Sequence, residues 1–429
     1  MERNKGITLI ALIITIIILL ILVGVSINLA IKGDLFGSAE KAVSGTNDKV
    51  AQEQTRVDEL MGELGRVEEQ QRQDNLPGTR VTENTKYVSN GKTAWIPAGF
   101  TISKAEGETT IDGGLVIYLI QDKTDEEIKN LTWTGTELEN LKKTYDQFVW
   151  IPISHEQINN MFICQAKTGN NGNCNITVEN GVAKCTVHNS TQMAGRLYAS
   201  NTGENYKKTY TEVYTANSGL REPDVITGNS TGDGTDFDGQ SAGLEYMKKV
   251  TEDNTSYAST AKFKETLQND YNETVASVYN AGGYYVGRYE TSNITSTKGT
   301  AINVVAGTKT NISNKNWYYM YAQQKAYVAN KSLGNKVKSS MMLGTCHEQM
   351  LEFVNVEGKY DVTKVGNALH NRSNSDGPWQ TAGLDYTDKT QYKDLSKNIY
   401  DLEGNVFEWT TEANNTNFRV NRGRPLRLQ

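Results

Sequence analysis

The most apolar stretch of the chain, residues 7–31, contains no charged side chain. Leucine and isoleucine dominate it, and its polar side chains are Thr8, Thr15, Ser26 and Asn28. At about 1.5 Å rise per residue, a helix of this length spans the roughly 30 Å hydrocarbon core of a bilayer. The pattern therefore predicts a helix that crosses a membrane.

The residues before this run predict its orientation. Arg3 and Lys5 precede it, and positive residues ahead of a membrane helix hold the N-terminus in the cytoplasm. We therefore expect a membrane-anchored protein with most of the chain on the cell surface. The string Lys5-Gly6-Ile7-Thr8-Leu9-Ile10 resembles the leader of type IV prepilins.

That resemblance implies cleavage between Gly6 and Ile7 and N-methylation of the new first residue. Residues 1–6 would then be a leader, and the helix of residues 7–31 would anchor the protein and pack against other pilin-like subunits. Pilins usually have glutamate at the fifth mature position, which is Ala11 here. Polymerisation into a pilus is thus left open, and so is an ordinary anchor that is never cleaved.

A helical stem is expected over residues 38–74. Val43, Val50, Val57 and Leu64 share one heptad position, and Leu60 and Val67 share another. Such a stripe suits packing along a partner helix or against the following domain. Asn75-Leu76-Pro77-Gly78 ends the pattern.

Shorter apolar runs follow and predict strands. Residues 79–145 are expected to form a small β-rich region, in which residues 94–97 and 114–120 are apolar. Residues 147–153 form another such run. Between about residues 189 and 270 the chain is rich in Thr, Asn, Gly and Ser, so irregular loops with short helices are expected.

Composition narrows the classes of partner. The net charge is −6, with both signs interspersed and no basic cluster, which argues against nucleic acid as a partner. The chain has 22 Tyr against 9 Phe and is rich in Asn, Thr and Gly. Tyrosine and asparagine supply contact area and adaptable hydrogen bonds, so the composition favours a recognition surface.

Three of the four cysteines, Cys164, Cys174 and Cys185, lie close together in a segment that predicts a hairpin turning at Asn180-Gly181. An oxidising exterior permits one disulfide among them and leaves an odd thiol. A zinc site that also uses His188 stays open as an alternative, although the segment has no Cys-x2-Cys knuckle.

Four downstream segments recur in a recognisable order. They are a strand over residues 282–291, a helix over residues 317–327, a loop and helix over residues 339–354, and the string Gly-Asn-Val-Phe-Glu-Trp within residues 398–410. Together they resemble the sulfatase-modifying-factor family, with its formylglycine-generating-enzyme fold, an elaboration of the C-type-lectin fold. The resemblance covers about residues 146–422.

The resemblance implies an α+β fold class, in which a long membrane helix and stem precede a C-type-lectin-like domain with many loops. That domain would occupy residues 146–429. The family continues with further strands, whereas this sequence stops shortly after Gly423, at Gln429. We therefore expect an incomplete domain, from a frameshifted or truncated reading frame.

Enzymes of this family oxidise a substrate cysteine with a copper-binding cysteine pair near the end of the domain. This chain has no cysteine after Cys346, and soft sulfur ligands select Cu(I). We therefore expect no copper and no enzyme, with Cys346 as a buried thiol. A formylglycine-generating-type oxidase that lacks its catalytic C-terminus is the enzymatic alternative.

Relatives also bind calcium through the segment that matches Asn405 to Glu408. Amide and carboxylate oxygens suit this hard cation, so Asn405 and Glu408 are candidate calcium ligands. The alternative is that both residues only satisfy buried backbone groups around Trp409.

Anchor, stem and lectin-like domain together suggest a pilin-like surface protein for recognition or adhesion, with an unknown protein or glycan as ligand. Two further alternatives are a structural pilus subunit and a variable protein of a diversity-generating retroelement. The Asn-rich residues 412–417 are compatible with the latter.

Overall fold

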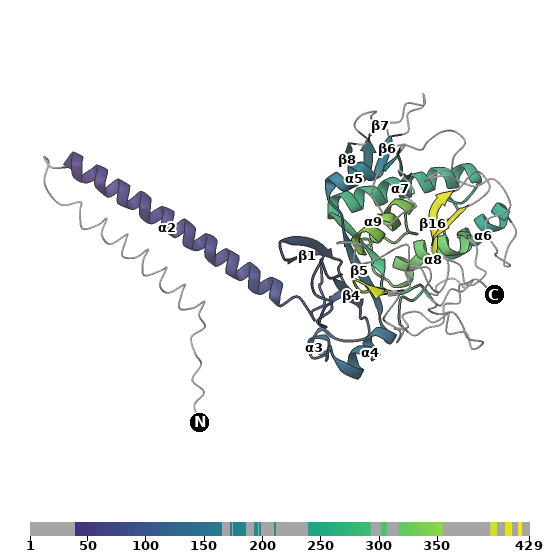
Figure 1. The fold of residues 1–429 in the computed structure, drawn as a ribbon, viewed down its shortest axis with the longest axis horizontal. Coiled ribbons are helices and arrows are strands. Elements are labelled where there is room, and N and C mark those ends of the chain that lie inside the picture. The colour runs from purple at the N-terminus through teal and green to yellow at the C-terminus, as the bar shows by residue number, and fades with distance from the viewer. Residues whose placement is uncertain are drawn as a thin grey trace, which may run out of the picture. The chain divides into compact units, whose positions relative to one another are not determined.

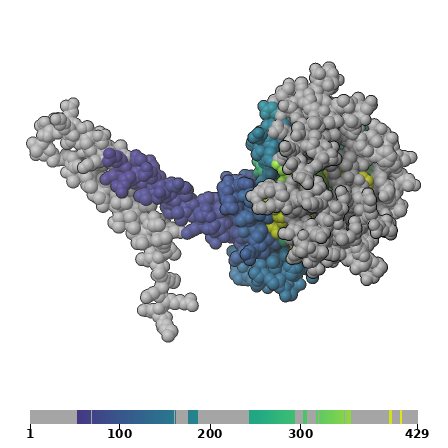
Figure 2. Space-filling view, in the orientation of Figure 1, coloured from purple at the N-terminus to yellow at the C-terminus, as the bar shows by residue number. Residues whose placement is uncertain are grey.

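The structure is a computed structural model of the full chain. It describes residues 39–164, 172–173, 175–185, 193–195, 197–198, 210–211, 239–292, 302–306, 317–354, 395–400, 408–413 and 419–422. Figures 1 and 2 draw the remaining residues in grey. The chain divides into two compact units, Met1–Arg72 and Gln73–Gln429, and each is considered by itself.

Helix α2, Ala39–Asp74, coincides with the stretch in which the heptad pattern predicts a helix. Part of its apolar surface is exposed, because Leu60, Met61 and Val67 are 46, 54 and 53% exposed, whereas Val57 and Leu64 are of intermediate burial. Gln54 and Asp58, four residues apart, hydrogen-bond over 2.9 Å on its surface and support the helix locally.

None of the helices that the structure describes combines the length and the apolar character that a bilayer crossing requires. The predicted membrane run of residues 7–31 lies outside the described residues.

The second unit is a mixed α+β structure with small antiparallel sheets. Its helices are α3 Asp125–Lys129, α4 Gly135–Thr144, α5 His155–Met161, α6 Gly239–Thr251, α7 Thr260–Ala281, α8 Trp317–Asn330 and α9 Gly344–Val354. Its strands are β1 Thr85–Ser89, β2 Lys92–Ile96, β3 Thr101–Ile102, β4 Val116–Leu119, β5 Asp146–Pro152, β6 Phe162–Cys164, β7 Gly172–Asn173, β8 Ile176–Glu179, β9 Val182–Cys185, β10 Met193–Gly195, β11 Leu197–Tyr198, β12 Tyr210–Thr211, β13 Gly283–Gly287, β14 Leu395–Ser396, β15 Ile399–Tyr400, β16 Glu408–Ala413 and β17 Arg419–Arg422.

The central sheet has the order β13-β5-β4-β3, with every neighbouring pair antiparallel. Figure 1 labels its two central strands, β4 and β5. Strand β4 is buried along its whole length. Its alternate side chains enter two different cores, with Ile117 and Leu119 in the first and Val116 and Tyr118 in the second. A strand covered on both faces needs apolar side chains on both, which explains the continuous apolar run.

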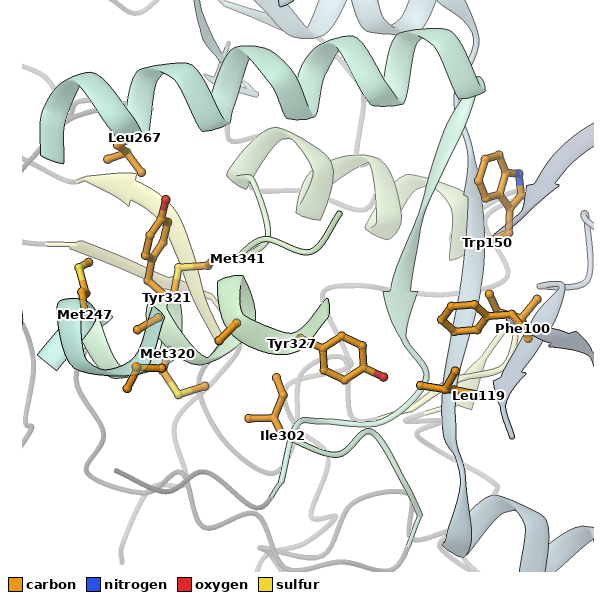
Figure 3. Close-up of a cluster of buried hydrophobic side chains, with 14 of the residues drawn as sticks. Phe100, Leu119, Trp150, Met247, Leu267, Ile302, Met320, Tyr321, Tyr327 and Met341 are labelled. Carbon is orange, nitrogen blue, oxygen red and sulfur yellow. The ribbon is translucent and has the colours of Figure 1, made fainter. Parts of the chain in front are cut away.

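Helices cover both faces of this sheet. On the first face, α6 and α8 lie side by side and bury the largest core, part of which Figure 3 shows. Side chains of α3, α4 and α9 fill the core on the second face. A third core joins α5 and α7 to the β8-β9 hairpin.

Local sequence signals explain how several elements begin and end. Asn180 and Gly181 have φ of 51° and 76° between β8 and β9, as a two-residue hairpin turn requires. Ser259 caps α7 by accepting a hydrogen bond from the Lys262 N–H. Gly282, with φ of 68°, ends α7 in the left-handed conformation and leads directly into β13.

The expected α+β class is confirmed at this level. The boundary expected at residue 145/146 stays a prediction, and it falls at the start of β5 in the central sheet. Strands β3 and β4 precede it and β5 and β13 follow it, yet all four form one sheet within Gln73–Gln429. The two stretches share that sheet because the apolar runs on either side of the boundary pair with each other.

Candidate functional site

The predicted calcium ligands belong to the connection between β15 and β16. Asn405 lies in residues 401–407, outside the described residues. Glu408 is the first residue of β16, where the antiparallel register places it opposite Arg422 of β17. The side chain of Glu408 also lies outside the described part of the chain. We call residues 401–408 the 401–408 segment, and its two flanks are described.

The first flank is fixed by main-chain and side-chain contacts. The Tyr400 N–H donates to the Arg288 carbonyl over 3.0 Å, and Ile399 is buried in the second core. The Asn398 amide Nδ2 donates to the carbonyl oxygens of Gly107 and Gly114, at 2.9 and 2.7 Å. This amide therefore holds the β14-β15 hairpin against the loop that precedes β4.

Gly114 makes this close approach possible. A Cβ atom added to Gly114 would lie 1.9 Å from the Lys397 carbonyl oxygen. Gly114 also has a backbone φ of 93°, which residues with a Cβ atom rarely adopt. The position thus requires glycine for two independent reasons.

The second flank is tied to Trp317 at the start of α8 and to Met342 just before α9. The Trp317 indole N–H donates to the Thr410 carbonyl over 2.8 Å, and the Thr411 N–H donates to the Met342 carbonyl over 3.0 Å. Trp317 is fully buried and stacks on Tyr321, with ring centroids 4.8 Å apart. Both flanks of the 401–408 segment are thus attached to packed elements.

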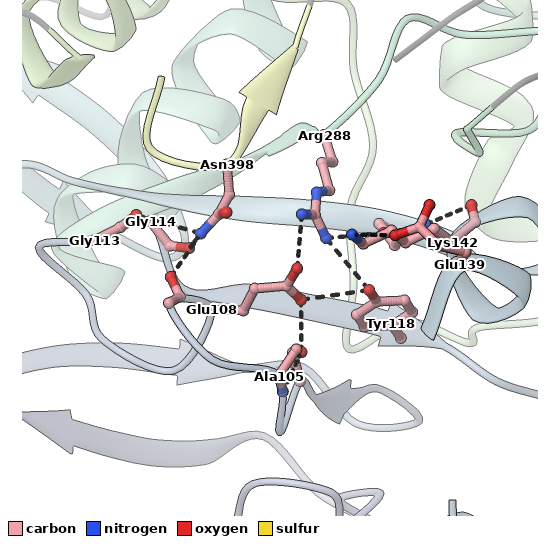
Figure 4. Close-up of polar contacts among 12 residues, drawn as sticks. Ala105, Glu108, Gly113, Gly114, Tyr118, Glu139, Lys142, Arg288 and Asn398 are labelled. Atoms are coloured by element: carbon pink, nitrogen blue, oxygen red, sulfur yellow. Dashed lines mark hydrogen bonds and ion pairs between the residues drawn. The ribbon is translucent and has the colours of Figure 1, made fainter. Parts of the chain in front are cut away.

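A buried ion pair lies next to the first flank (Figure 4). Arg288 Nη2 and Glu108 Oε1 are 2.7 Å apart, and their side chains are 2 and 4% exposed. Arg288 Nη1 donates to Gln147 Oε1 over 3.1 Å, and Ser103 Oγ donates to Glu108 Oε2 over 2.6 Å. The guanidinium carbon also lies 5.7 Å from the centre of the Tyr400 ring.

The electrostatics of this cluster favour a fixed structure over proton transfer. Burial raises the pKa of Tyr118 and Tyr289 well above the usual value, against the opposing effect of Arg288. Burial works to lower the pKa of Arg288, but its interactions with Tyr289, Glu108 and Tyr118 outweigh this, so the net change is upward. At neutral pH, Arg288 therefore stays cationic and both tyrosines stay neutral, which suits a clamp beneath Tyr400.

Sequence reasoning missed Arg288 and Glu108. Glu108 belongs to a polar stretch, residues 106–110, that is typical of a loop. Arg288 carried the usable signal, because it lies in the predicted strand of residues 282–291, among glycine and aromatic residues, and a buried arginine there needs a partner. The sequence does not identify that partner, which lies 180 positions away.

The cysteines divide into two kinds. Cys185 is buried and disulfide-bonded, while Cys346 is a buried free thiol. The side chains of Cys164 and Cys174, the other disulfide candidates, lie outside the described residues.

Within the described ranges, no three His, Cys, Asp or Glu side chains gather closely enough to hold a metal ion. The alternative zinc site falls on residues that are not described, among them His188. The predicted leader cleavage position, between Gly6 and Ile7, and Ala11 are likewise outside the described residues.

The chain was compared with protein-family models, curated proteins and solved structures. No protein-family model, no curated protein and no solved structure matches this chain.

Proposed function

We propose that this chain is a membrane-anchored, pilin-like surface protein that displays a lectin-like domain for recognition or adhesion. The observation that carries the proposal is the charge-free run of residues 7–31 behind Arg3 and Lys5. A run of this length inserts readily into a bilayer, and the preceding positive charges favour a cytoplasmic N-terminus.

Helix α2 supports a role as stem. Its 36 residues make a helix about 54 Å long at 1.5 Å per residue. Charged and amide side chains cover most of it, which suits a helix surrounded by water. The exposed Leu60, Met61 and Val67 offer an apolar stripe for neighbouring copies of the stem or for other pilin-like subunits.

The anchored flanks of the 401–408 segment support a binding role for the second unit. The flanks fix where this segment begins and ends on the packed unit, which supports its use as a place to present side chains to a ligand. We propose a C-type-lectin-like arrangement for this unit, a protein or glycan as ligand, and calcium held by Asn405 and Glu408.

The anchor is tested by cell fractionation of the full chain. We expect the wild-type protein in the membrane fraction and resistant to extraction by high salt. The double variant Leu19→Asp/Leu20→Asp places two carboxylates in the middle of the run, each costing roughly 3 kcal/mol in the bilayer, so it should leave the membrane fraction. The matched control Leu19→Ile/Leu20→Ile should behave as wild type. A wild-type protein that stays in the soluble fraction would rule out the anchor.

The leader is tested on the same purified protein by determining its first residue. Cleavage after Gly6 predicts an N-methylated Ile7 at the N-terminus. A chain that still begins with the preceding residues would instead support the uncleaved anchor.

A further inference from the structure

Helix α8 and Lys331, the residue that follows it, supply two tyrosine–lysine pairs whose members are four residues apart, and each pair contacts one aspartate. Tyr321 and Lys325 contact Asp270 of α7, at 2.5 and 3.0 Å. Tyr327 and Lys331 contact Asp146 at the start of β5, both at 2.7 Å. Residues four apart lie on the same side of a helix, which explains the repeated arrangement.

The pair Tyr327–Lys331 differs from the pair Tyr321–Lys325 because a side-chain carboxamide, that of Asn303, lies beside its lysine. Lys331 Nζ donates to the side-chain oxygen Oδ1 of Asn303 over 3.1 Å. Within the described part of the chain, Lys325 hydrogen-bonds to no side-chain amide. Of these two described pairs, the one with Lys331 therefore brings an amine, a carboxamide and a carboxylate together.

These three groups are held in place by their backbones. The Asn303 main chain pairs with Ser292 in both directions, at 3.0 and 2.8 Å. The Val304 N–H donates to Asp146 Oδ1 over 2.7 Å. Lys331 lies directly after α8, and its N–H donates to the Tyr327 carbonyl over 2.9 Å. Fixed positions of this kind convert a reaction between two groups into an intramolecular one.

The surroundings are largely dry. The Asp146 side chain is 2% exposed and that of Lys331 is 18% exposed. Ile302 and Val304, the neighbours of Asn303, are both buried, and Ile302 and Tyr327 belong to the core of Figure 3. The Lys331 ammonium also lies 5.7 Å from the centre of the Tyr327 ring.

We propose that Lys331 and Asn303 form a covalent amide cross-link within the chain, with Asp146 as the catalytic proton carrier. The Lys331 ammonium gives one proton to Asp146 Oδ2, which replaces a buried ion pair by two neutral groups. The neutral amine attacks Asn303 Cγ and forms the new C–N bond. Asp146 passes this proton to the departing nitrogen as the bond from Cγ to Nδ2 breaks. The carboxylate then takes the second proton from the former Lys331 nitrogen and delivers it to the released ammonia, which leaves as an ammonium ion.

The balance of this step is complete without a co-reactant. The reactants are the Lys331 ammonium and the Asn303 carboxamide, and the products are a secondary amide and an ammonium ion. No electron is transferred, and Asp146 returns to its carboxylate form. A lysine amine that has given up its proton is a known protein nucleophile.

Tyr327 acts as a positioning residue. Its hydroxyl donates to the same oxygen of Asp146 that faces Lys331. Burial, and then the charge of Asp146, raise the pKa of Tyr327 well above its usual value, so the hydroxyl remains a donor at neutral pH. The hydrogen bond keeps the carboxylate turned toward the lysine.

The cross-link is tested by mass spectrometry on the folded, purified full chain. We expect the wild-type protein to be lighter than its sequence by one ammonia molecule. Tryptic digestion should leave the bond after Lys331 uncut and yield a branched peptide that joins residues 299–309 to residues 326–336. A wild-type chain of unmodified mass that is cleaved after Lys331 would overturn the proposal, whatever the variants do.

Three variants assign the roles. Asn303→Ala and Lys331→Arg should each restore the unmodified mass, because one lacks the acceptor and the other the amine. Asp146→Asn should also give the unmodified mass, although Lys331 and Asn303 are both still present, because the proton carrier is missing. The matched control Lys325→Arg alters the lysine of the other pair and should keep the loss of ammonia. A branched peptide that persists in Asn303→Ala would contradict the assignment.

Discussion

At the scale of single residues, Arg288 and Glu108 place two opposite charges in the interior of the second unit. Two charges are withdrawn from water, and the loss is offset by their 2.7 Å contact and by hydrogen bonds from Ser103 and to Gln147. Such a pair adds little net stability compared with apolar residues. Removing one partner is costly, because the other charge is left buried.

Substitution of Arg288 tests this account. We expect Arg288→Met to lower the free energy of unfolding by about 3–5 kcal/mol, measured by denaturant titration. The double variant Arg288→Met/Glu108→Met should recover part of this loss, since the buried charge is gone while Ser103 and Tyr118 still lack their partner.

The control for this prediction is an exposed pair in the same unit, Lys262 and Glu265, whose charged atoms lie 2.8 Å apart. Lys262→Met should cost less than about 1 kcal/mol. A small effect of Arg288→Met, comparable to that of Lys262→Met, would contradict the clamp beneath Tyr400.

Tyr145 gives a prediction about alkaline pH. Burial and the hydrogen bond to Asp122 raise its pKa from 10.0 to about 12. Because the pKa is higher in the folded protein, its contribution is fully present below pH 10 and is lost as the pH rises towards 12. Denaturant titrations across this window should show falling stability, and Tyr145→Phe should show a smaller fall. An equal fall in both proteins would exclude Tyr145 as a cause.

At the scale of elements, sequence patterns predict what local rules determine. The heptad stripe predicts α2, the Asn180-Gly181 turn predicts the β8-β9 hairpin, and the apolar runs predict β4 and β5. Each depends on residues close together in the chain. The strand order β13-β5-β4-β3 is different, because it joins segments more than a hundred residues apart.

The candidate site shows the same division. The motif at residues 398–410 identifies the stretch, whereas its supports come from distant parts of the chain. Asn398 hydrogen-bonds to Gly107 and Gly114, and Trp317 hydrogen-bonds to Thr410. These residues are far apart in the sequence, so local sequence patterns do not predict the contacts. Lys331 and Asn303 likewise meet only because α8 returns to the start of β5.

The 401–408 segment carries the prediction about calcium. Oxygen ligands from Asn405 and Glu408 should bind the ion, and loss of one carboxylate should weaken binding about tenfold or more. Calorimetry with calcium should therefore show weaker binding for Glu408→Gln than for wild type, and the chelated protein should melt at a lower temperature than the calcium-loaded one.

The matched control is Glu412→Gln, four residues further along β16, which should bind calcium as wild type does. If the wild-type protein released no heat on calcium addition and the chelator left its melting temperature unchanged, the calcium site would be contradicted. The result would favour the alternative, in which Asn405 and Glu408 only satisfy buried backbone groups around Trp409.

At the scale of the whole molecule, the chain combines a charge-free run, a long exposed helix and a packed α+β unit. The first is suited to a bilayer, the second to water, and the third has cores on both faces of its central sheet. This order along the chain is the basis for proposing a surface protein that holds a binding unit outside the cell.

The most direct test is protease treatment of intact cells that express the full chain with a short tag at its N-terminus, in a Gly6 variant that retains the leader. The account predicts that external protease removes fragments of residues 73–429 while the tag remains protected inside. Protection of both parts until the cells are broken open would contradict surface display.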